Sequence, residues 1–418
     1  MSNESALDKD ITLSSPDSSF DRSVVPVHAK TSGVSHILRA HWPVLLGGLG
    51  IRLVCVALLY GEQLSPDREG FAFGWEVGRV ARSMVLGNGF ASPLTGDTGP
   101  TAWLPPVYTS LLAAVFKILG IYSAQSAIAI LTLNSLFSTI TIIPLVVIAQ
   151  EIFDGRVARW AAWGWSLFPL GIFIPVTKIW GEPLDALLMA VVLLMSLRMA
   201  GTSSSSYWFS GGMLVGLAAL TNPNTMAVIP GLWGWSCLRL KRRGRTWRNP
   251  LAIGTLGLVI VIAPWFMRNY AVFGQFLPFR SNFWLEVYIA NNSRTPVMLV
   301  DWHAHPASSP IEMSEYRRLG ELSYMSAKRQ QSLSFIRNHP GTFLLLTARR
   351  FLFVWTGFWS SDPRYLASEP LQIPLIFFNT AFSILIVMGM AMAWRARRPE
   401  LFPFVVLVVC QPAVYYLT

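Results

Sequence analysis

Long apolar runs recur along the chain and determine its expected architecture. Most of them approach or exceed the roughly 20 residues that an α-helix needs to cross the hydrocarbon core of a bilayer. A helix satisfies its own backbone hydrogen bonds in lipid, so each run predicts a membrane helix. We therefore expect an all-α fold, a polytopic membrane helical bundle with about ten crossings. The runs lie at about 42–60, 106–122, 126–150, 157–176, 183–200, 207–238, 251–267, 371–394 and 401–417.

Polar positions inside the apolar pattern predict where helices break or lie flat. Thr221–Asn224 is a turn signal, so run 207–238 should form two short helices. Run 106–122 must be short, tilted or re-entrant if the basic loops are to lie on one side of the membrane. Phe343–Trp359 carries two arginines in its middle, which favours a helix at the membrane surface over a crossing. Arg52 lies within the first run and should face a buried partner or a lipid-phosphate cavity.

Composition agrees with a membrane protein and indicates its orientation. The chain is 53% hydrophobic and 13% charged, whereas soluble proteins average about 25% charged residues. Its formal net charge is +11, and basic residues cluster in short loops at Arg239–Arg248 and Arg395–Arg398. The positive-inside rule makes these loops cytoplasmic. We therefore expect a multi-pass protein of the plasma (inner) membrane, with a cytoplasmic N-terminus and no nucleic-acid partner.

The polar segments divide the chain into a tail and a membrane domain. Residues 1–35 are rich in Ser, Asp and Pro, and they predict a disordered cytoplasmic tail without the pattern of a cleavable signal peptide. Residues 36–418 form the predicted multi-pass transmembrane domain. Within this domain, two long polar segments at about 61–105 and 270–342 should lie on the external side and carry juxtamembrane helices.

The first external segment contains an amphipathic helix within GFAFGWEVGRVARSMVLGNGF, residues 70–90. Its apolar positions share one face of a helical wheel, while Glu76, Arg79 and Arg82 lie on the other face. This pattern is typical of a helix at the water–lipid boundary. Glu76 and Arg79 have the spacing of an ion pair. The helix is therefore either a membrane anchor with a surface ion pair or part of a functional site.

Ordered motifs that begin in this helix resemble a known family. Together they look like the GT-C membrane glycosyltransferases, in particular the bacterial branch related to protein O-mannosyltransferases and the lipid A aminoarabinose transferase. The resemblance implies a helical bundle of GT-C type. The motifs are Ala-Arg-Ser-Met at 81–84, Gly-Asn-Gly at 87–89, Pro-Pro-Val-Tyr at 105–108, IWGEPLDALL at 179–188, ALTNP at 219–223, PWFMRNYAVFGQFLPFRSN at 264–282 and YIANN at 288–292.

The resemblance implies that a hexose or pentose moves from a polyprenyl-phosphate-linked sugar to an acceptor hydroxyl, with inversion at the sugar carbon. The acceptor could be a lipid, a glycan or a protein, and membrane lipids are further partners. Such a reaction needs a carboxylate that takes the hydroxyl proton and cations that stabilise the departing phosphate. Glu76 is the first candidate base and Glu182 the second. The alternative role for Glu182 is a helix cap beside Pro183.

The expected substrate contacts include several cations and amides. Arg268 ends an apolar run, and its guanidinium would suit a phosphate, with Asn269 and Arg280 nearby. The alternative for Arg268 is an anchor at the membrane interface. Asn291 could bind sugar hydroxyls or form a polar turn. The resemblance adds four further substrate contacts, which are Arg79, Arg82, Tyr108 and Asn222.

The chain departs from the family pattern at several motif positions. When the Ala-Arg-Ser-Met motif is aligned, the usual acid of the family falls on an apolar residue one helical turn before Glu76. Asp67 and Glu69 are therefore rivals of Glu76. The departing positions are Phe73, Leu104 and Asn222, where the resemblance implies an acid, a lysine and an arginine.

Two alternatives concern a metal and a different function. The stretch DWHAHP places His303 and His305 near Asp301, a set that could hold a divalent metal. An ordinary loop is the preferred interpretation, and we expect no cofactor. The helix break at Asn222–Pro223 would also fit a transporter or flippase that moves a lipid-linked sugar without breaking a bond.

Overall fold

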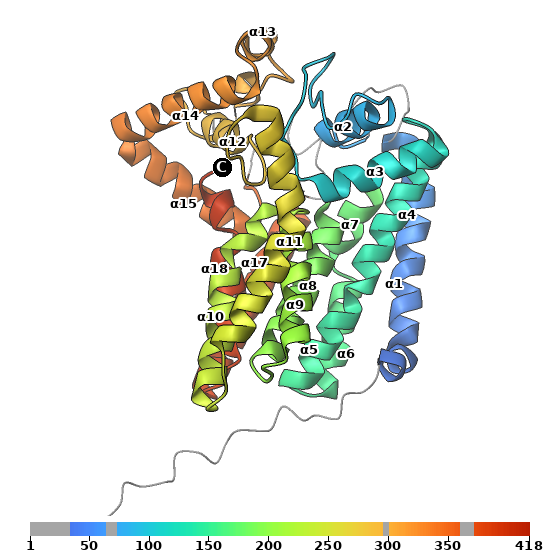
Figure 1. The fold of residues 1–418 in the computed structure, drawn as a ribbon. Helices are drawn as coiled ribbons and strands as arrows, with labels where there is room; N and C mark the ends of the chain where they lie inside the picture. Colours follow the sequence, from blue (N-terminus) through green and yellow to red (C-terminus); the bar gives the residue numbers. More distant parts are fainter. Residues whose placement is uncertain (1–33, 64–72, 296–300, 360–371) are drawn as a thin grey trace, which may run out of the picture.

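The computed structural model shows a bundle of helices with further helices gathered at one end (Figure 1). It describes residues 34–63, 73–295, 301–359 and 372–418. The predicted cytoplasmic tail lies almost entirely outside this part of the chain and stays a prediction. The helices are α1 (Val34–Gln63), α2 (Glu76–Val85), α3 (Pro106–Leu119), α4 (Ala124–Ile140), α5 (Ile142–Ile152), α6 (Gly155–Ser166), α7 (Pro169–Thr177), α8 (Glu182–Met199), α9 (Ser205–Ala219), η2 (Pro223–Ala227), α10 (Ile229–Arg242), α11 (Arg248–Phe273), α12 (Phe283–Ala290), η3 (Trp302–Ala304), α13 (Pro310–Leu319), α14 (Glu321–Asn338), α15 (Pro340–Thr356), α17 (Gln372–Arg395), α18 (Leu401–Cys410) and η4 (Ala413–Tyr416).

The fold class expected from the sequence is confirmed. Within the described residues, the one extended feature is an isolated bridge between Ala91 and Pro100. Five helical stretches there are long and apolar enough to cross a membrane, so the chain is a polytopic helical bundle. The expected number of about ten crossings is not confirmed, because the remaining helices are shorter or more polar. The five stretches are Arg39–Leu59, Ala124–Ile152, Gly155–Thr177, Arg248–Phe273 and Gln372–Arg395.

The interrupted apolar runs form short helices. α9 ends at Ala219 and α10 begins at Ile229, with η2 between them, as the turn signal predicts. α3 has 14 residues, which is about 21 Å of helix and too short for a hydrocarbon core of about 30 Å. α15 lies with α14 outside the main bundle (Figure 1), in agreement with a helix at the membrane surface.

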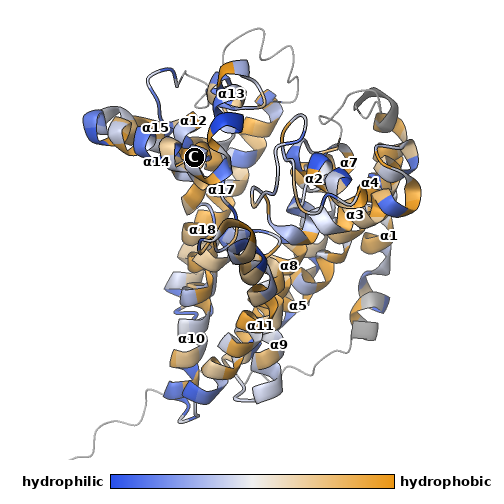
Figure 2. Cartoon of the chain, turned by 45° about the horizontal axis from the view of Figure 1, so that its top comes forward, coloured by the Kyte–Doolittle hydropathy of each residue, from blue (hydrophilic) through white to orange (hydrophobic). Residues whose placement is uncertain are grey.

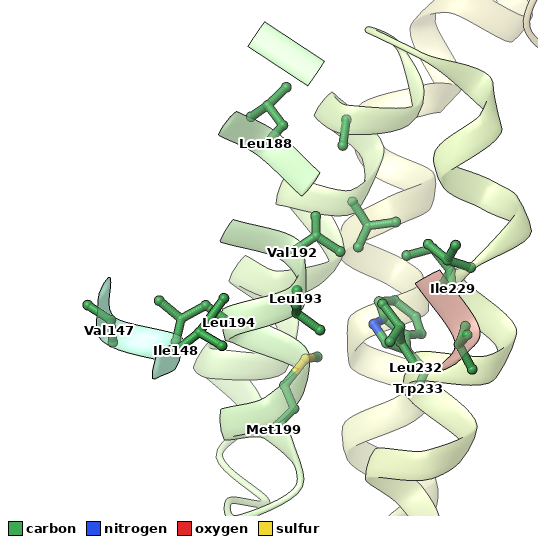
Figure 3. Close-up of a cluster of buried hydrophobic side chains, with 14 of the residues drawn as sticks. Val147, Ile148, Leu188, Val192, Leu193, Leu194, Met199, Ile229, Leu232 and Trp233 are labelled. Atoms are coloured by element: carbon green, nitrogen blue, oxygen red, sulfur yellow. The ribbon is translucent and has the colours of Figure 1, made fainter. Parts of the chain in front are cut away.

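Small residues let α9 and α11 pack with their backbones in contact. A Cβ at Gly212 of α9 would lie 1.9 Å from the carbonyl oxygen of Gly254 in α11. Only glycine fits such a contact, and close approach at small residues is a common basis of helix association in lipid. α8 and α10 pack through larger apolar side chains, among them Leu193 and Leu232 (Figure 3).

Arg52 shows how the bundle accommodates a fully buried cation. It lies in α1, and its guanidinium donates hydrogen bonds to the carbonyl oxygens of Ser166 and Gly171. Ser166 ends α6, where carbonyl groups lack helical partners. Gly171 lies four residues before Pro175, which has no N–H to donate to it. Arg52 therefore supplies hydrogen-bond donors to the free carbonyl groups at the break between α6 and α7. These carbonyl groups are the buried partner expected from the sequence.

The helices gathered at one end form a small core of their own. α12, α13 and α14 pack there with the loop that leads into α3. α2 lies at the same end, beside α3 (Figure 2). These elements come from the two segments that the sequence places outside the membrane. The buried side chains of this core include Leu94, Trp103, Leu285, Tyr316 and Tyr324.

Candidate functional site

Glycine at position 74 lets α2 contact the segment that leads into α8. Gly74 has a φ of +75°, and a Cβ there would lie 2.3 Å from the carbonyl oxygen of Ile179. A side chain would break this contact, so glycine is required for both reasons. α2 begins at Glu76 and α8 begins at Glu182. The two acids expected from the sequence therefore lie on adjacent elements.

Glu76 is a carboxyl group in largely buried surroundings. Its side chain is 17% exposed, and its Oε1 lies 3.9 Å from Nε2 of His305. Its pKa is raised to about 7, chiefly by burial and also by the carboxylate of Glu286, while Arg79 opposes the rise. A group with a pKa near the working pH suits general base catalysis. The rival acids lie outside the described residues; they are Asp67 and Glu69.

His305 presents a neutral imidazole to Glu76. Burial lowers its pKa to about 4, and the charge of Arg79 adds to this effect, so the ring is uncharged near neutral pH. Its Nδ1 accepts a hydrogen bond from the amide of Ala307. The ring proton is therefore on Nε2, the atom that faces Glu76. The imidazole thus offers a donor, and no positive charge, to this carboxyl group.

Arg79 is the cation whose charge acts on both Glu76 and His305. It is half-buried. Its Nη1 is buried and has no hydrogen-bond partner among the described residues. A buried donor without an acceptor is unfavourable, so an anionic group of a ligand would satisfy it. Arg82, also predicted to bind substrate, is exposed near the end of α2.

A second carboxyl group, that of Glu286 in α12, raises the pKa of Glu76. This residue was not predicted from the sequence as part of the site. Burial raises its pKa, and the charge of Arg280 partly opposes this rise. The Nδ2 of Asn282 donates to its Oε1 at 3.0 Å, while the Oδ1 of Asn282 is buried without a donor among the described residues. The available signal was a single acid inside the apolar stretch Phe283–Ala290.

Asp185 and Asn222 join α8 to the helix break. The Nδ2 of Asn222 donates to Oδ2 of Asp185 at 2.7 Å, and its Oδ1 accepts the amide of Asn224. The other oxygen of Asp185, Oδ1, is buried without a donor in the described part of the chain. Glu182 is exposed at the first position of α8. The structure therefore pairs the predicted Asn222 with Asp185, an acid in the first turn of α8.

Tyr415 connects the two groups of acids. The side chain of Asn224 lies close to its hydroxyl. Arg280 also acts on Glu286, so its charge reaches both groups of acids. The charged groups that act on Tyr415 are Asp185, Glu182 and Arg280.

Arg268 binds the backbone of the loop between α2 and α3. Its Nη1 donates to the carbonyl oxygen of Thr101 at 2.6 Å, and its Nη2 to that of Phe90 at 2.7 Å. Nη1 also donates to the side-chain oxygen of Asn269. The side-chain amide of Asn269 in turn donates to the carbonyl oxygen of Leu277. Both predicted phosphate contacts therefore hold a loop in place, and a phosphate would have to replace these bonds.

Tyr108 and Asn291 are buried and have partners within the protein. The Tyr108 hydroxyl donates to the side chain of Asn134 at 3.1 Å. The Oδ1 of Asn291 accepts a hydrogen bond from Arg350 of α15 at 3.2 Å. Arg350 also donates to the carbonyl oxygen of Ala290. Both side chains therefore have partners within the protein, and the substrate roles of Tyr108 and Asn291 stay predictions.

Glu321, which the sequence did not single out, anchors three segments at this end. It is 7% exposed and begins α14. Its carboxylate ties the loop before α3 and the loop before α12 to the junction of α13 and α14. A buried carboxylate with this many donors is fully satisfied. The donors are the Thr101 hydroxyl, the Ala102 amide, the Ser281 hydroxyl and the Tyr316 hydroxyl.

The residues considered for a metal do not converge. Asp301 pairs with Arg294 at 3.2 Å and accepts the backbone amide of His303, while His305 faces α2. Among the described residues, no group of three or more His, Cys, Asp or Glu side chains could hold a metal ion. The expectation that the protein needs no cofactor stays a prediction.

Comparison with known families identifies the central part of the chain. Residues 104–267 match the family model described as dolichyl-phosphate-mannose-protein mannosyltransferase. The comparison with curated proteins returned no match. The matched segment includes Glu182 and Asn222, whereas Glu76 and Arg268 lie outside it. The match supports the resemblance drawn from the motifs, because residues 104–267 are similar to a family of GT-C membrane glycosyltransferases.

Proposed function

We propose that this protein transfers a sugar from a polyprenyl-phosphate donor to an acceptor hydroxyl at the external face of the membrane. The acceptor oxygen attacks the anomeric carbon, and the bond from that carbon to the phosphate oxygen breaks. The proton of the hydroxyl passes to Glu76, and polyprenyl phosphate leaves. Attack opposite the leaving group inverts the configuration at the sugar carbon.

The environment of Glu76 is the observation that carries this proposal. The carboxyl group is buried, its pKa is raised to about 7, and its neighbour His305 is neutral. A base of this kind is ionised in part at neutral pH and binds a proton more strongly than an ordinary glutamate. The neutral imidazole leaves that basicity intact, because it places no positive charge beside the carboxylate.

Arg79 is the residue that we assign to the donor phosphate. One of its guanidinium nitrogens is buried without an acceptor among the described residues, and a phosphate oxygen would supply that acceptor. Arg280, which acts on Glu286 and Tyr415, is the second cation of the group. This assignment differs from the sequence-based expectation, in which Arg268 held the phosphate, because the Arg268 guanidinium binds backbone carbonyls.

We assign the sugar hydroxyls to Asp185 and Glu182 at the start of α8. Asp185 keeps one buried oxygen without a donor among the described residues, and Glu182 is exposed beside it. A sugar hydroxyl is a donor that can reach either carboxylate. Asn222 then orients Asp185 through its 2.7 Å hydrogen bond, and it acts as a positioning residue.

The proposal is tested with membranes that contain the protein and a panel of polyprenyl phosphates that carry radiolabelled hexoses or pentoses. Formation of a new glycosidic bond to a membrane acceptor is the expected result. Glu76→Gln should lower this rate by about 10²–10⁴-fold, the usual contribution of a general base. Asp97→Asn is the matched control, since Asp97 is an exposed carboxylate of the same external segment, and it should transfer at the wild-type rate.

Two outcomes would contradict the proposal. A Glu76→Gln variant that transfers at the wild-type rate would exclude Glu76 as the base. Movement of the labelled lipid across sealed vesicles without any new glycosidic bond would favour the alternative, a transporter or flippase that uses the break at Asn222.

A further inference from the structure

An apolar cavity lies between α10 and α11, away from the carboxylate-bearing helices. It has a volume of about 570 Å³, within the range of about 300–1,000 Å³ that is usual for small-molecule sites. Its walls are mainly apolar, and Lys241 lines one part of it. The other lining residues include Ile229, Trp233, Gly234, Trp247 and Leu251.

The packing of the neighbouring helices explains why this space stays open. α11 is held against α9 by the glycine contact at Gly212. α10 is held on its other side, where the Ser236 hydroxyl donates to the carbonyl oxygen of Ser196 in α8. Gly231 of α10 also packs against Val406 of α18. α10 and α11 thus pack against different partners, and their facing sides leave a cavity between them that is open to the outside.

The C-terminal end of α10 and the N-terminal end of α11 place cations at one end of the cavity. Lys241, Arg242 and Arg248 are exposed, and Arg248 lies 5.6 Å from the ring of Trp247, a lining residue. Arg239, in the last turn of α10, pairs with Glu400 at 4.0 Å, whereas Lys241 and Arg248 have no such carboxylate partner among the described residues. An anion at this end would therefore meet uncompensated positive charge.

Trp233, which lines the same cavity, carries an unpaired donor. Trp233 is 5% exposed, and its indole Nε1 is buried without a hydrogen-bond partner among the described residues. It lies eight residues before Lys241, which is about 12 Å along the helix axis. Helical side chains tilt toward the N-terminus of their helix, so the Lys241 stem shortens this separation. The cavity thus combines a cationic mouth and apolar walls, and one of its lining residues carries an unpaired neutral donor.

We propose that this cavity binds an anionic diacyl glycerophospholipid. Its phosphate contacts Lys241, an ester carbonyl accepts the indole N–H of Trp233, and an acyl chain fills the apolar space. The ester carbonyl decides the class of lipid, because a polyprenyl phosphate has no acceptor below its phosphate. The excess of cations over carboxylates at the mouth favours an anionic head group over a zwitterionic one.

Native mass spectrometry of the purified full chain with added lipid tests this inference. The probes are phosphatidylglycerol and phosphatidylcholine. The wild-type protein should retain a phosphatidylglycerol in preference to phosphatidylcholine. Gly234→Phe should abolish this preference, because a Cβ at Gly234 meets no atom within 4 Å and the ring would fill the cavity. Gly50→Phe in α1 is the matched control, since a Cβ there is equally unobstructed.

A second variant, which removes a charge at the mouth, tests the proposal independently of Gly234→Phe. Lys241→Gln should weaken phosphatidylglycerol binding by about fivefold, the effect of one cation near an anionic surface. Arg395→Gln, at the exposed end of α17, should change nothing. Equal retention of the two lipids by the wild-type protein would overturn the proposal. Displacement of phosphatidylglycerol by equimolar polyprenyl phosphate, or full retention by Gly234→Phe, would also overturn it.

Discussion

Two buried carboxylates at the same end of the molecule have opposite surroundings. Glu321 accepts hydrogen bonds from one hydroxyl and one backbone amide of the loop before α3. It also accepts hydrogen bonds from two hydroxyls of neighbouring segments. Glu76 instead lies near a second carboxyl group, Glu286, and a neutral histidine, His305. Buried polar groups are normally satisfied, and perturbed acids concentrate at functional sites. The contrast indicates a structural role for Glu321 and supports the chemical role proposed for Glu76.

The arginines of this end show the same contrast. Arg268 donates to two backbone carbonyls of the first external segment, so its hydrogen-bonding capacity is spent on holding a loop. Arg79 keeps a buried nitrogen without an acceptor among the described residues. A cation that is already satisfied gains little from a phosphate, whereas an unsatisfied one gains a charge-assisted hydrogen bond. Hydrogen-bond partners therefore separate the two roles better than residue type does.

The largest expected effect is a loss of stability when Glu321 is replaced. Absence of this loss would contradict the contrast between Glu321 and Glu76 most directly. Glu321→Ala leaves several buried donors without an acceptor and should destabilise the protein by at least about 3 kcal/mol. Thermal unfolding in detergent measures this change. Glu76→Gln should not destabilise the protein. The pKa of Glu76 is raised to about 7 in the folded protein, so its ionisation lowers the stability of the fold as pH rises through about 7. A glutamine cannot ionise and avoids this loss. Equal losses in both variants would contradict the assigned roles.

The next effect concerns the donor phosphate. Arg79→Gln removes a charge-assisted hydrogen bond worth about 1.5–3 kcal/mol, which corresponds to a rise of roughly 10–100-fold in the KM for the lipid-linked sugar. Arg82→Gln, on the same helix but exposed, should change the KM little. Initial rates at varied donor concentration measure both. A larger effect at Arg82 than at Arg79 would move the phosphate site along α2.

The smallest of these effects concerns the sugar. Asp185→Asn replaces a charge-assisted hydrogen bond to Asn222 by a neutral one, a change of about 1 kcal/mol, or roughly fivefold in the KM. Asp154→Asn is a suitable control, because Asp154 is an exposed helix cap at α6. Transfer assays with each variant would show the difference, and an unchanged KM in Asp185→Asn would remove this residue from the sugar site.

The sequence predicted the elements of the fold better than the partners of each side chain. Apolar runs and the Thr221–Asn224 turn signal depend on neighbours in the chain, so helices and breaks follow from local pattern. The charge pattern of α2 likewise indicated Glu76. Its partner His305 is more than two hundred residues away, and local pattern carries no information on such a contact. Arg268 illustrates the same limit, since its acceptors are carbonyls whose positions depend on the path of a loop.

The central claim is that Glu76 is a general base whose pKa is raised by burial and by Glu286. The pH dependence of transfer in the wild-type protein and in Glu286→Gln tests this claim most directly. The wild-type rate should rise about tenfold per pH unit below roughly pH 7 and level off above it, because the base must lose its proton to act. Glu286→Gln removes one cause of the raised pKa, so its midpoint should move to lower pH. A flat wild-type profile, or the same midpoint in both proteins, would contradict the claim.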